Sequence, residues 1–251
     1  MTERAEVTAD ARDGVVAGRT ILVGLGIGVG IAVTLGLTTG FVLPFAVPAL
    51  GSADWLGTII AAQAYGALVI GHAVAFGGFA QMHQRLRVTR APWRDIGLAC
   101  LVFLALWAAL LIAFALLHER VALVGTISAA VVKIGSLYGR LDGATPALLL
   151  SSLVQPILIT PYFEEVLFRG SMFSWLRLKL GARRTIVVTS VAFALYHPML
   201  PLWPIAFLFG IAGGWIRERT QSVTPFIIVH ALNSILIIGG AYIVAGWKVI
   251  E

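Results

Sequence analysis

The stretch 96-IGLACLVFLALWAALLIAFALL-117 decides the class of fold, because it contains no charged side chain over its whole length. A helix of about 20 apolar residues is long enough to cross the hydrocarbon core of a bilayer. The rest of the chain has the same character, since 59% of all residues are apolar and only 12% are charged. The mean hydropathy of +0.94 is far from the balance of a soluble globular domain. The sequence therefore predicts a polytopic membrane protein.

Similar apolar runs predict an all-α bundle of seven transmembrane helices. The runs cover residues 20–39, 57–80, 96–117, 145–168, 184–200, 202–216 and 223–246. An eighth span over 121–139 is an alternative, but it would reverse the orientation of everything that follows it. We therefore favour seven spans, with residues 118–144 as a re-entrant or surface element.

The positions of lysine and arginine predict the orientation, because short cytoplasmic loops carry an excess of these residues. Seven spans with a cytoplasmic N-terminus place 14 of the 18 Lys and Arg residues on the cytoplasmic side, Arg169 and Arg217 among them. The net charge of +6 then fits attraction to anionic lipid. The basic residues are scattered over several loops, so no nucleic-acid partner is expected. We expect a multi-pass protein of the cell membrane.

Two adjacent glutamates, Glu164 and Glu165, lie in one of the apolar runs, and Arg169 follows them. A charged side chain at membrane depth is costly and is by default a sign of function. On a helix, residues four apart share a face, so Glu165 and Arg169 can form an ion pair while Glu164 points elsewhere. The spacing predicts that Glu164 is left unpaired and serves as a general base. Pro161 cannot donate to a backbone carbonyl, which predicts a local opening of the helix.

Histidines in two later apolar runs complete a candidate acid–base site. Phe193 and His197 are one helical turn apart, so the phenyl ring can support the imidazole, and the proline after His197 predicts a helix end there. His230 shares a helix face with Asn233 and with Ser234, which predicts two hydrogen-bond donors for an oxyanion.

The other notable residues are assigned to structure. Small residues four apart, in 24-GLGIGVG-30 and at Gly210 and Gly214, predict close helix packing. His72 has no acidic neighbour in sequence and is assigned to packing or a helix contact, whereas His83 and His118 flank loops and are predicted to be solvated.

The chain is predicted to form one membrane domain in three parts. Residues 1–19 are a cytoplasmic tail, residues 20–144 are a transmembrane scaffold, and residues 145–246 are the core that carries the candidate site.

The order Glu-Glu-x-x-x-Arg, then Phe-x-x-x-His, then His with Asn on the same helical face, resembles the CPBP family of intramembrane glutamic proteases. This family is also called the CAAX-protease and bacteriocin-processing or Abi family, and the resemblance covers residues 145–246. It implies hydrolysis of a membrane-associated, prenylated or other peptide substrate without a metal or cofactor. It implies that water is activated by Glu164 and His197, that the oxyanion is stabilised by His230 and Asn233, and that support comes from Glu165 and Arg169. The third motif departs from the family pattern, which places Asn or Asp where Ser234 stands.

Two alternatives stay open on the residues alone. A zinc metalloprotease would use Glu164, His197 and His230 as ligands, which is an acceptable catalytic shell, but the sequence has no H-E-x-x-H motif. A proton or ion pathway, or a non-enzymatic scaffold, would also bury charge in a membrane. The lack of repeated halves argues against a secondary transporter.

Overall fold

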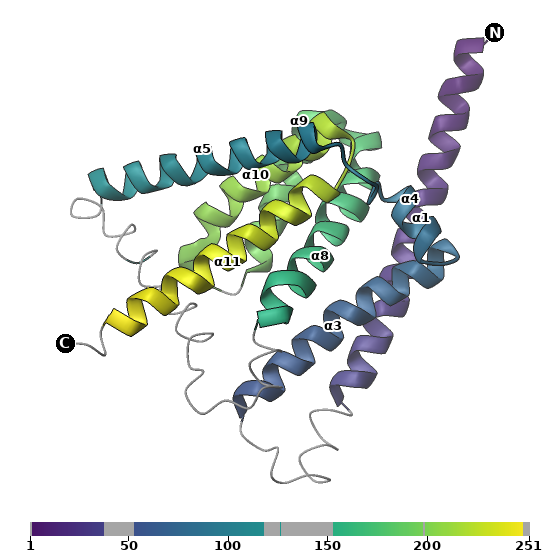
Figure 1. Ribbon diagram of the computed structural model, residues 1–251. Coiled ribbons are helices and arrows are strands. Elements are labelled where there is room, and N and C mark those ends of the chain that lie inside the picture. The colour runs from purple at the N-terminus through teal and green to yellow at the C-terminus, as the bar shows by residue number, and fades with distance from the viewer. Residues whose placement is uncertain (1, 38–52, 118–125, 127–152, 198, 248–251) are drawn as a thin grey trace.

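The computed structural model describes residues 2–37, 53–117, 126, 153–197 and 199–247. All regular structure within these residues is helical, which confirms the predicted all-α class (Figure 1). Apart from residue 126, the alternative span at 121–139 lies outside the described residues, as does the first part of the span predicted at 145–168.

The N-terminal half of the described chain contains four helices. They are α1 (Thr2–Leu37), α3 (Ala53–Phe76), α4 (Phe79–Arg85) and α5 (Trp93–Leu117). Helix α1 therefore also includes most of the predicted N-terminal tail. In Figure 1, α1 and α3 lie side by side, while α5 runs above α10 and α11 and contacts both.

The C-terminal half begins with a helix that alternates between π-helical and α-helical hydrogen bonding. A π-helical segment (Gln155–Ile159) leads into α8 (Thr160–Glu165), a second π-helical segment (Val166–Met172) follows, and the chain continues as α9 (Phe173–Tyr196). A short 3₁₀ turn (Leu200–Leu202), α10 (Trp203–Thr220) and α11 (Thr224–Trp247) complete it. Helix α8 contacts both α3 and α11, so it occupies the centre of the bundle (Figure 1).

Three described helical stretches are long and apolar enough to cross a membrane: Gly18–Leu35, Trp93–Leu117 and Leu200–Thr220. Two shorter apolar stretches, Gly66–Phe76 and Thr224–Gly240, accompany them. On α5, Leu101 and Leu104 are 66% and 60% exposed, whereas Ala99 and Phe103 are buried against the bundle. A helix that shows leucine on most of its surface is suited to lipid contact. The chain is therefore a helical membrane protein.

Glycines allow two helix pairs to approach closely. A Cβ atom added to Gly28 of α1 would lie 2.6 Å from the Cα atom of Leu68 on α3. A Cβ atom on Gly210 of α10 would lie 2.9 Å from the Cα atom of Ser190 on α9. Both distances are too short for real atoms, so the predicted close packing of the small residues is confirmed at these positions.

The α1–α3 contact gives a first prediction. Gly28→Ala should destabilise the protein by about 1–3 kcal/mol, because the new methyl group meets backbone that cannot move aside. Gly26→Ala is the matched control, since a Cβ atom there meets nothing within 4 Å. Thermal unfolding in detergent micelles measures both variants. Equal midpoints for Gly28→Ala and Gly26→Ala would show that the two helices are not held in this close contact.

The segment 169–183, which the sequence places between two spans, is helical in the structure. The chain changes direction at Gly181, where φ is 73° and ψ is 171°, a backbone conformation that glycine tolerates well. Arg169 and Arg217 are 1% and 5% exposed, so they are interior residues rather than loop charges. Their sequence context resembles that of the nearby surface arginines, and their burial results from the partners that tertiary packing provides.

Candidate active site

Arg169 is held in the interior by a carboxylate and two aromatic rings. Its guanidinium donates to Glu165 Oε1 at 2.9 Å, and both side chains are buried. The guanidinium carbon lies 4.2 Å from the ring centroid of Phe193 and 5.4 Å from that of Phe226. A Cβ atom on Gly213 would come within 3.0 Å of Arg169 Nε, so this glycine leaves room for the guanidinium. The predicted pair between Glu165 and Arg169 is confirmed.

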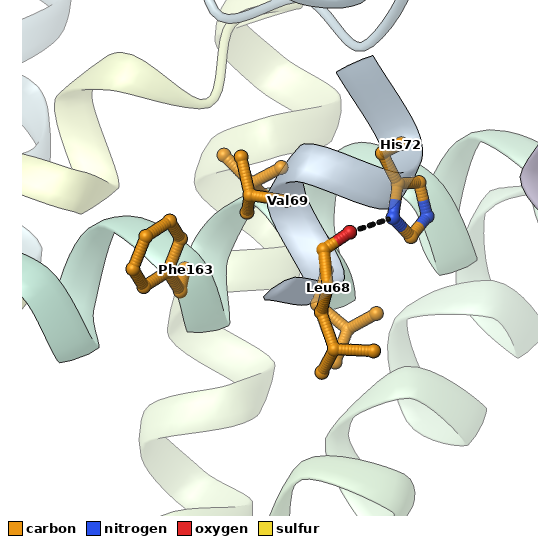
Figure 2. Close-up of a pocket in the computed structure, with 6 residues that line it drawn as sticks. Leu68, Val69, His72 and Phe163 are labelled. Carbon is orange, nitrogen blue, oxygen red and sulfur yellow. Dashed lines mark hydrogen bonds between the residues drawn. The ribbon is translucent and has the colours of Figure 1, made fainter. Parts of the chain in front are cut away.

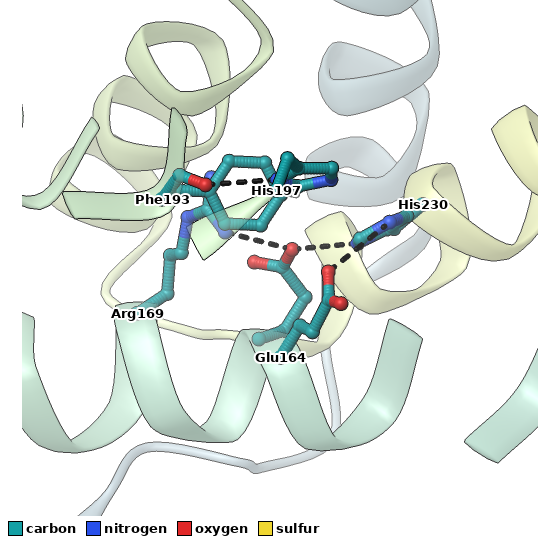
Figure 3. A network of polar contacts seen from close by, with 6 residues as sticks. Glu164, Arg169, Phe193, His197 and His230 are labelled. Atoms are coloured by element: carbon teal, nitrogen blue, oxygen red, sulfur yellow. Dashed lines mark hydrogen bonds and ion pairs between the residues drawn. The ribbon is translucent and has the colours of Figure 1, made fainter. Parts of the chain in front are cut away.

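His230 of α11 lies against both glutamates of α8. Its Nδ1 is 2.8 Å from Glu165 Oε1, and its Nε2 is 3.8 Å from Glu164 Oε2 (Figure 3). The prediction that Glu164 is left unpaired is therefore wrong. Adjacent helical residues diverge by about 100°, but an imidazole has nitrogens on two edges and reaches both carboxylates. Glu164 is buried as well, at 4% exposed.

His197 follows the last residue of α9, which confirms the predicted helix end. Its Nδ1 donates to the carbonyl of Phe193 at 2.9 Å, because a carbonyl can only accept. In the neutral ring, Nε2 then carries the lone pair. The indole N–H of Trp203 donates to the carbonyl of His197 at 2.9 Å and fixes the chain beyond the helix.

The ring of Phe193 connects the parts of the site. Its centroid is 4.8 Å from that of His197 and 6.0 Å from that of His230, while Arg169 covers it at 4.2 Å. Figure 3 shows His197, His230, Arg169 and the carboxylate of Glu164 gathered around one region of the interior. The predicted packing of Phe193 beside His197 is confirmed. The buried ring of Phe193 also contacts the guanidinium of Arg169 and the imidazole of His230.

Asn233 lies one turn beyond His230 on α11. Its Oδ1 accepts a hydrogen bond from the indole Nε1 of Trp107 at 3.1 Å. Neither this tryptophan nor Trp203 was expected at the site from the sequence, and each bonds a motif residue. The tryptophan itself was the signal in the sequence, because the indole N–H group in an apolar helix needs a hydrogen-bond acceptor on a neighbouring helix.

Some buried polar atoms at the site have no hydrogen-bond partner among the described residues. They are Glu165 Oε2 and Arg169 Nη2.

The residues of the site do not form an evident metal centre. Within the described ranges, no group of three or more His, Cys, Asp and Glu side chains is arranged to hold a metal ion. A carboxylate on one ring nitrogen, as Glu165 is on Nδ1 of His230, orients metal-ligating and catalytic histidines alike.

The histidines outside the motifs have structural contacts. His72 is buried, its Nδ1 bonds the carbonyl of Leu68 at 2.7 Å, and it lines a small apolar cavity with Val69 and Phe163 (Figure 2). Its assignment to packing is confirmed. His83 is half-buried and lies 2.5 Å from the hydroxyl of Tyr162, so the prediction of a solvated side chain is wrong. His118 lies outside the described residues.

Comparison with known proteins adds one match. Residues 146–236 match the family model of type II CAAX prenyl endopeptidase, Rce1-like. No curated protein and no solved structure matches the chain. The match contains all three motifs and indicates a membrane protease of the CAAX type, which is a hydrolase. The predicted resemblance to the CPBP or CAAX-protease family is therefore confirmed over residues 146–236.

Proposed function

We propose that the chain is an intramembrane glutamic endopeptidase that uses a water molecule activated by Glu164. The observation that carries this proposal is the contact of His230 with both buried carboxylates, 2.8 Å from Glu165 and 3.8 Å from Glu164. A buried carboxylate beside an imidazole is suited to proton transfer. The family match over the same residues supports a protease.

The reaction begins with water bound between Glu164 and His197. Glu164 takes a proton from the water, and the oxygen attacks the carbonyl carbon of the scissile amide. The tetrahedral oxyanion accepts hydrogen bonds from His230, when its Nε2 is protonated, and from the amide of Asn233. The proton on Glu164 then passes to the amide nitrogen, the C–N bond breaks, and the oxyanion collapses to a carboxylic acid. His197 holds the water through Nε2, because its Nδ1 is committed to the backbone.

Glu165 and Arg169 support the reaction without touching the substrate. Arg169 compensates the charge of Glu165, and Glu165 in turn fixes the ring of His230 through Nδ1. A ring held at one nitrogen presents its other nitrogen in a defined direction, as in metal and catalytic sites where a carboxylate orients a histidine. The low dielectric of a helix bundle strengthens these hydrogen bonds.

The substrate in this proposal is a peptide bond of a membrane-associated protein, and a prenylated CaaX sequence is the first one to test. The protein lies in the cell membrane with its N-terminus in the cytoplasm. Arg169 and Arg217 are buried, so they no longer count among the loop charges that predict this orientation. The basic residues at the exposed end of α9, such as Arg177, still support it.

His197→Ala tests the water-binding role. We expect cleavage of a quenched fluorescent farnesylated CaaX peptide by purified protein in liposomes to fall by about a hundredfold or more. Leu195→Ala is the matched control, since this neighbour on the same helix is 54% exposed, and it should cleave normally. Equal activity of the two variants would remove His197 from the mechanism.

The same assay distinguishes the zinc alternative. Treatment of the wild-type protein with a strong chelator, followed by metal analysis, should leave cleavage unchanged if Glu164 acts as the base. Loss of cleavage on chelation, with recovery on addition of zinc, would replace the glutamic mechanism by a metal-dependent one.

A further inference from the structure

Helix α5 packs against the bundle along one face. Ala99, Phe103 and Trp107 are spaced four apart, and they form the side of α5 that packs against the aromatic core. The rings of Phe103 and Trp107 meet edge to face with centroids 6.3 Å apart. Leu104 and Leu111, on other sides of the helix, are about 60% exposed. Trp107 is directed toward α11, because its indole bonds Asn233 of that helix.

The bond between Trp107 and Asn233 defines which way the amide of Asn233 faces. An indole N–H can donate but cannot accept, so the atom 3.1 Å from Trp107 Nε1 must be the amide oxygen. The orientation of an asparagine amide is usually ambiguous, and here the partner resolves it. The NH₂ group, which carries both donors of the side chain, is on the other branch of the amide and away from the indole.

We propose that Trp107 is a positioning residue that holds Asn233 as an oxyanion donor. This inference rests on the proposed role of Asn233 in amide hydrolysis. A donor that is fixed before the reaction costs no reorganisation when the negative charge develops. Without Trp107, the amide of Asn233 rotates between orientations, and only some of them present the NH₂ group beside His230.

The position of Asn233 in the sequence explains why an external partner is useful. The family pattern places the amide or carboxyl residue four positions after the histidine, and this chain has Ser234 there. Asn233 is three positions after His230 and is therefore rotated around α11 relative to the family pattern. A hydrogen bond from a neighbouring helix selects the rotamer that compensates for this change. The bond thus assigns the second donor to Asn233 rather than to Ser234.

The contact is tested first without any substrate. The full chain, labelled with ¹⁵N at its seven tryptophan indoles, gives one side-chain N–H resonance for each, and Trp107→Phe identifies that of Trp107. Asn233→Leu should move this resonance upfield, because the hydrogen bond is lost. Ser234→Ala should leave it in place. An unchanged resonance in Asn233→Leu would refute the contact.

Kinetics then test the positioning role. Trp107→Phe keeps an aromatic ring but loses the N–H group, and we expect kcat to fall about tenfold with KM unchanged. Asn233→Leu should lower kcat about a hundredfold, as the loss of an oxyanion donor does. In the double variant, Trp107→Phe should have no further effect, because there is no amide left to orient. Trp93→Phe is the control, since this indole is 80% exposed at the start of the same helix.

The outcomes separate this inference from the proposed function. If Asn233→Leu lowers kcat while Trp107→Phe does not, or if the two losses multiply, Trp107 does not position the amide. If cleavage continues in Glu164→Gln, the proposed function fails, and the indole resonance still decides whether the contact exists.

Discussion

Glu164→Gln is expected to lower kcat for peptide cleavage by at least about a thousandfold while the protein still inserts and folds. Glutamine has nearly the same size as glutamate, but its amide cannot take the proton from the attacking water. General bases contribute about 10²–10⁴ to enzymatic rates, and Glu164 also has to return the proton to the leaving nitrogen. Initial rates with the farnesylated peptide in liposomes, at saturating substrate, measure the effect directly.

Glu218→Gln is the matched control for this variant. Glu218 accepts two hydrogen bonds from Arg177, each at 2.9 Å, and this ion pair lies near the protein surface. Its loss of charge should leave kcat unchanged. Substantial cleavage by purified Glu164→Gln would eliminate the glutamate base, even if the protein proved to be a protease by another mechanism.

Arg169→Met should cause the largest loss of stability. The substitution removes the guanidinium from the completely buried carboxylate of Glu165. Leaving one partner of a buried ion pair behind costs about 3–5 kcal/mol, and the Nδ1 of His230 offsets part of this by retaining its bond to Glu165. We expect a loss of about 3 kcal/mol or more in unfolding experiments in micelles, or failure to accumulate in the membrane.

Two comparisons make this result specific. Arg177→Met breaks an ion pair that is partly exposed, so its cost should stay within about 1 kcal/mol. The double variant Glu165→Leu/Arg169→Met should be more stable than Arg169→Met alone, because the carboxylate of Glu165 is no longer left buried without its guanidinium partner. If Arg169→Met were as stable as the wild-type protein, the charge of Glu165 would have to be compensated by another group.

Local spacing was sufficient to predict several features of the site. The pair of Glu165 and Arg169, the packing of Phe193 beside His197 and the helix end at His197 all follow from helical periodicity or from proline within a few residues. The glycine spacing around Gly28 likewise predicted a close helix contact, although it did not identify α3 as the partner. These features depend on neighbours in sequence, so a single chain reveals them.

Other features depend on how helices meet, and the sequence did not reveal them. The bridging of both glutamates by His230 requires α11 to lie against α8, and the bond from Trp107 to Asn233 requires α5 to lie over α11. Arg217 resembles a loop charge in sequence, yet its Nε donates to the carbonyl of Arg169 at 3.2 Å in the interior. Periodicity identifies the face of a helix, whereas the partner on that face is set by tertiary packing.

The two π-helical segments on either side of α8 determine where this part of the gene can change in length. A π-helical turn holds more residues than an α-turn, and such turns are frequent at functional sites. The loss of one residue beyond Arg169 in Val166–Met172 can be taken up by closing the wide turn to an α-turn, which keeps α9 in register. The loss of one residue from α9 between Gly181 and Phe193 cannot be taken up in this way, and it rotates His197 by about 100° relative to the carboxylates. A deletion scan should therefore find single-residue deletions better tolerated in the π-helical turn than in α9.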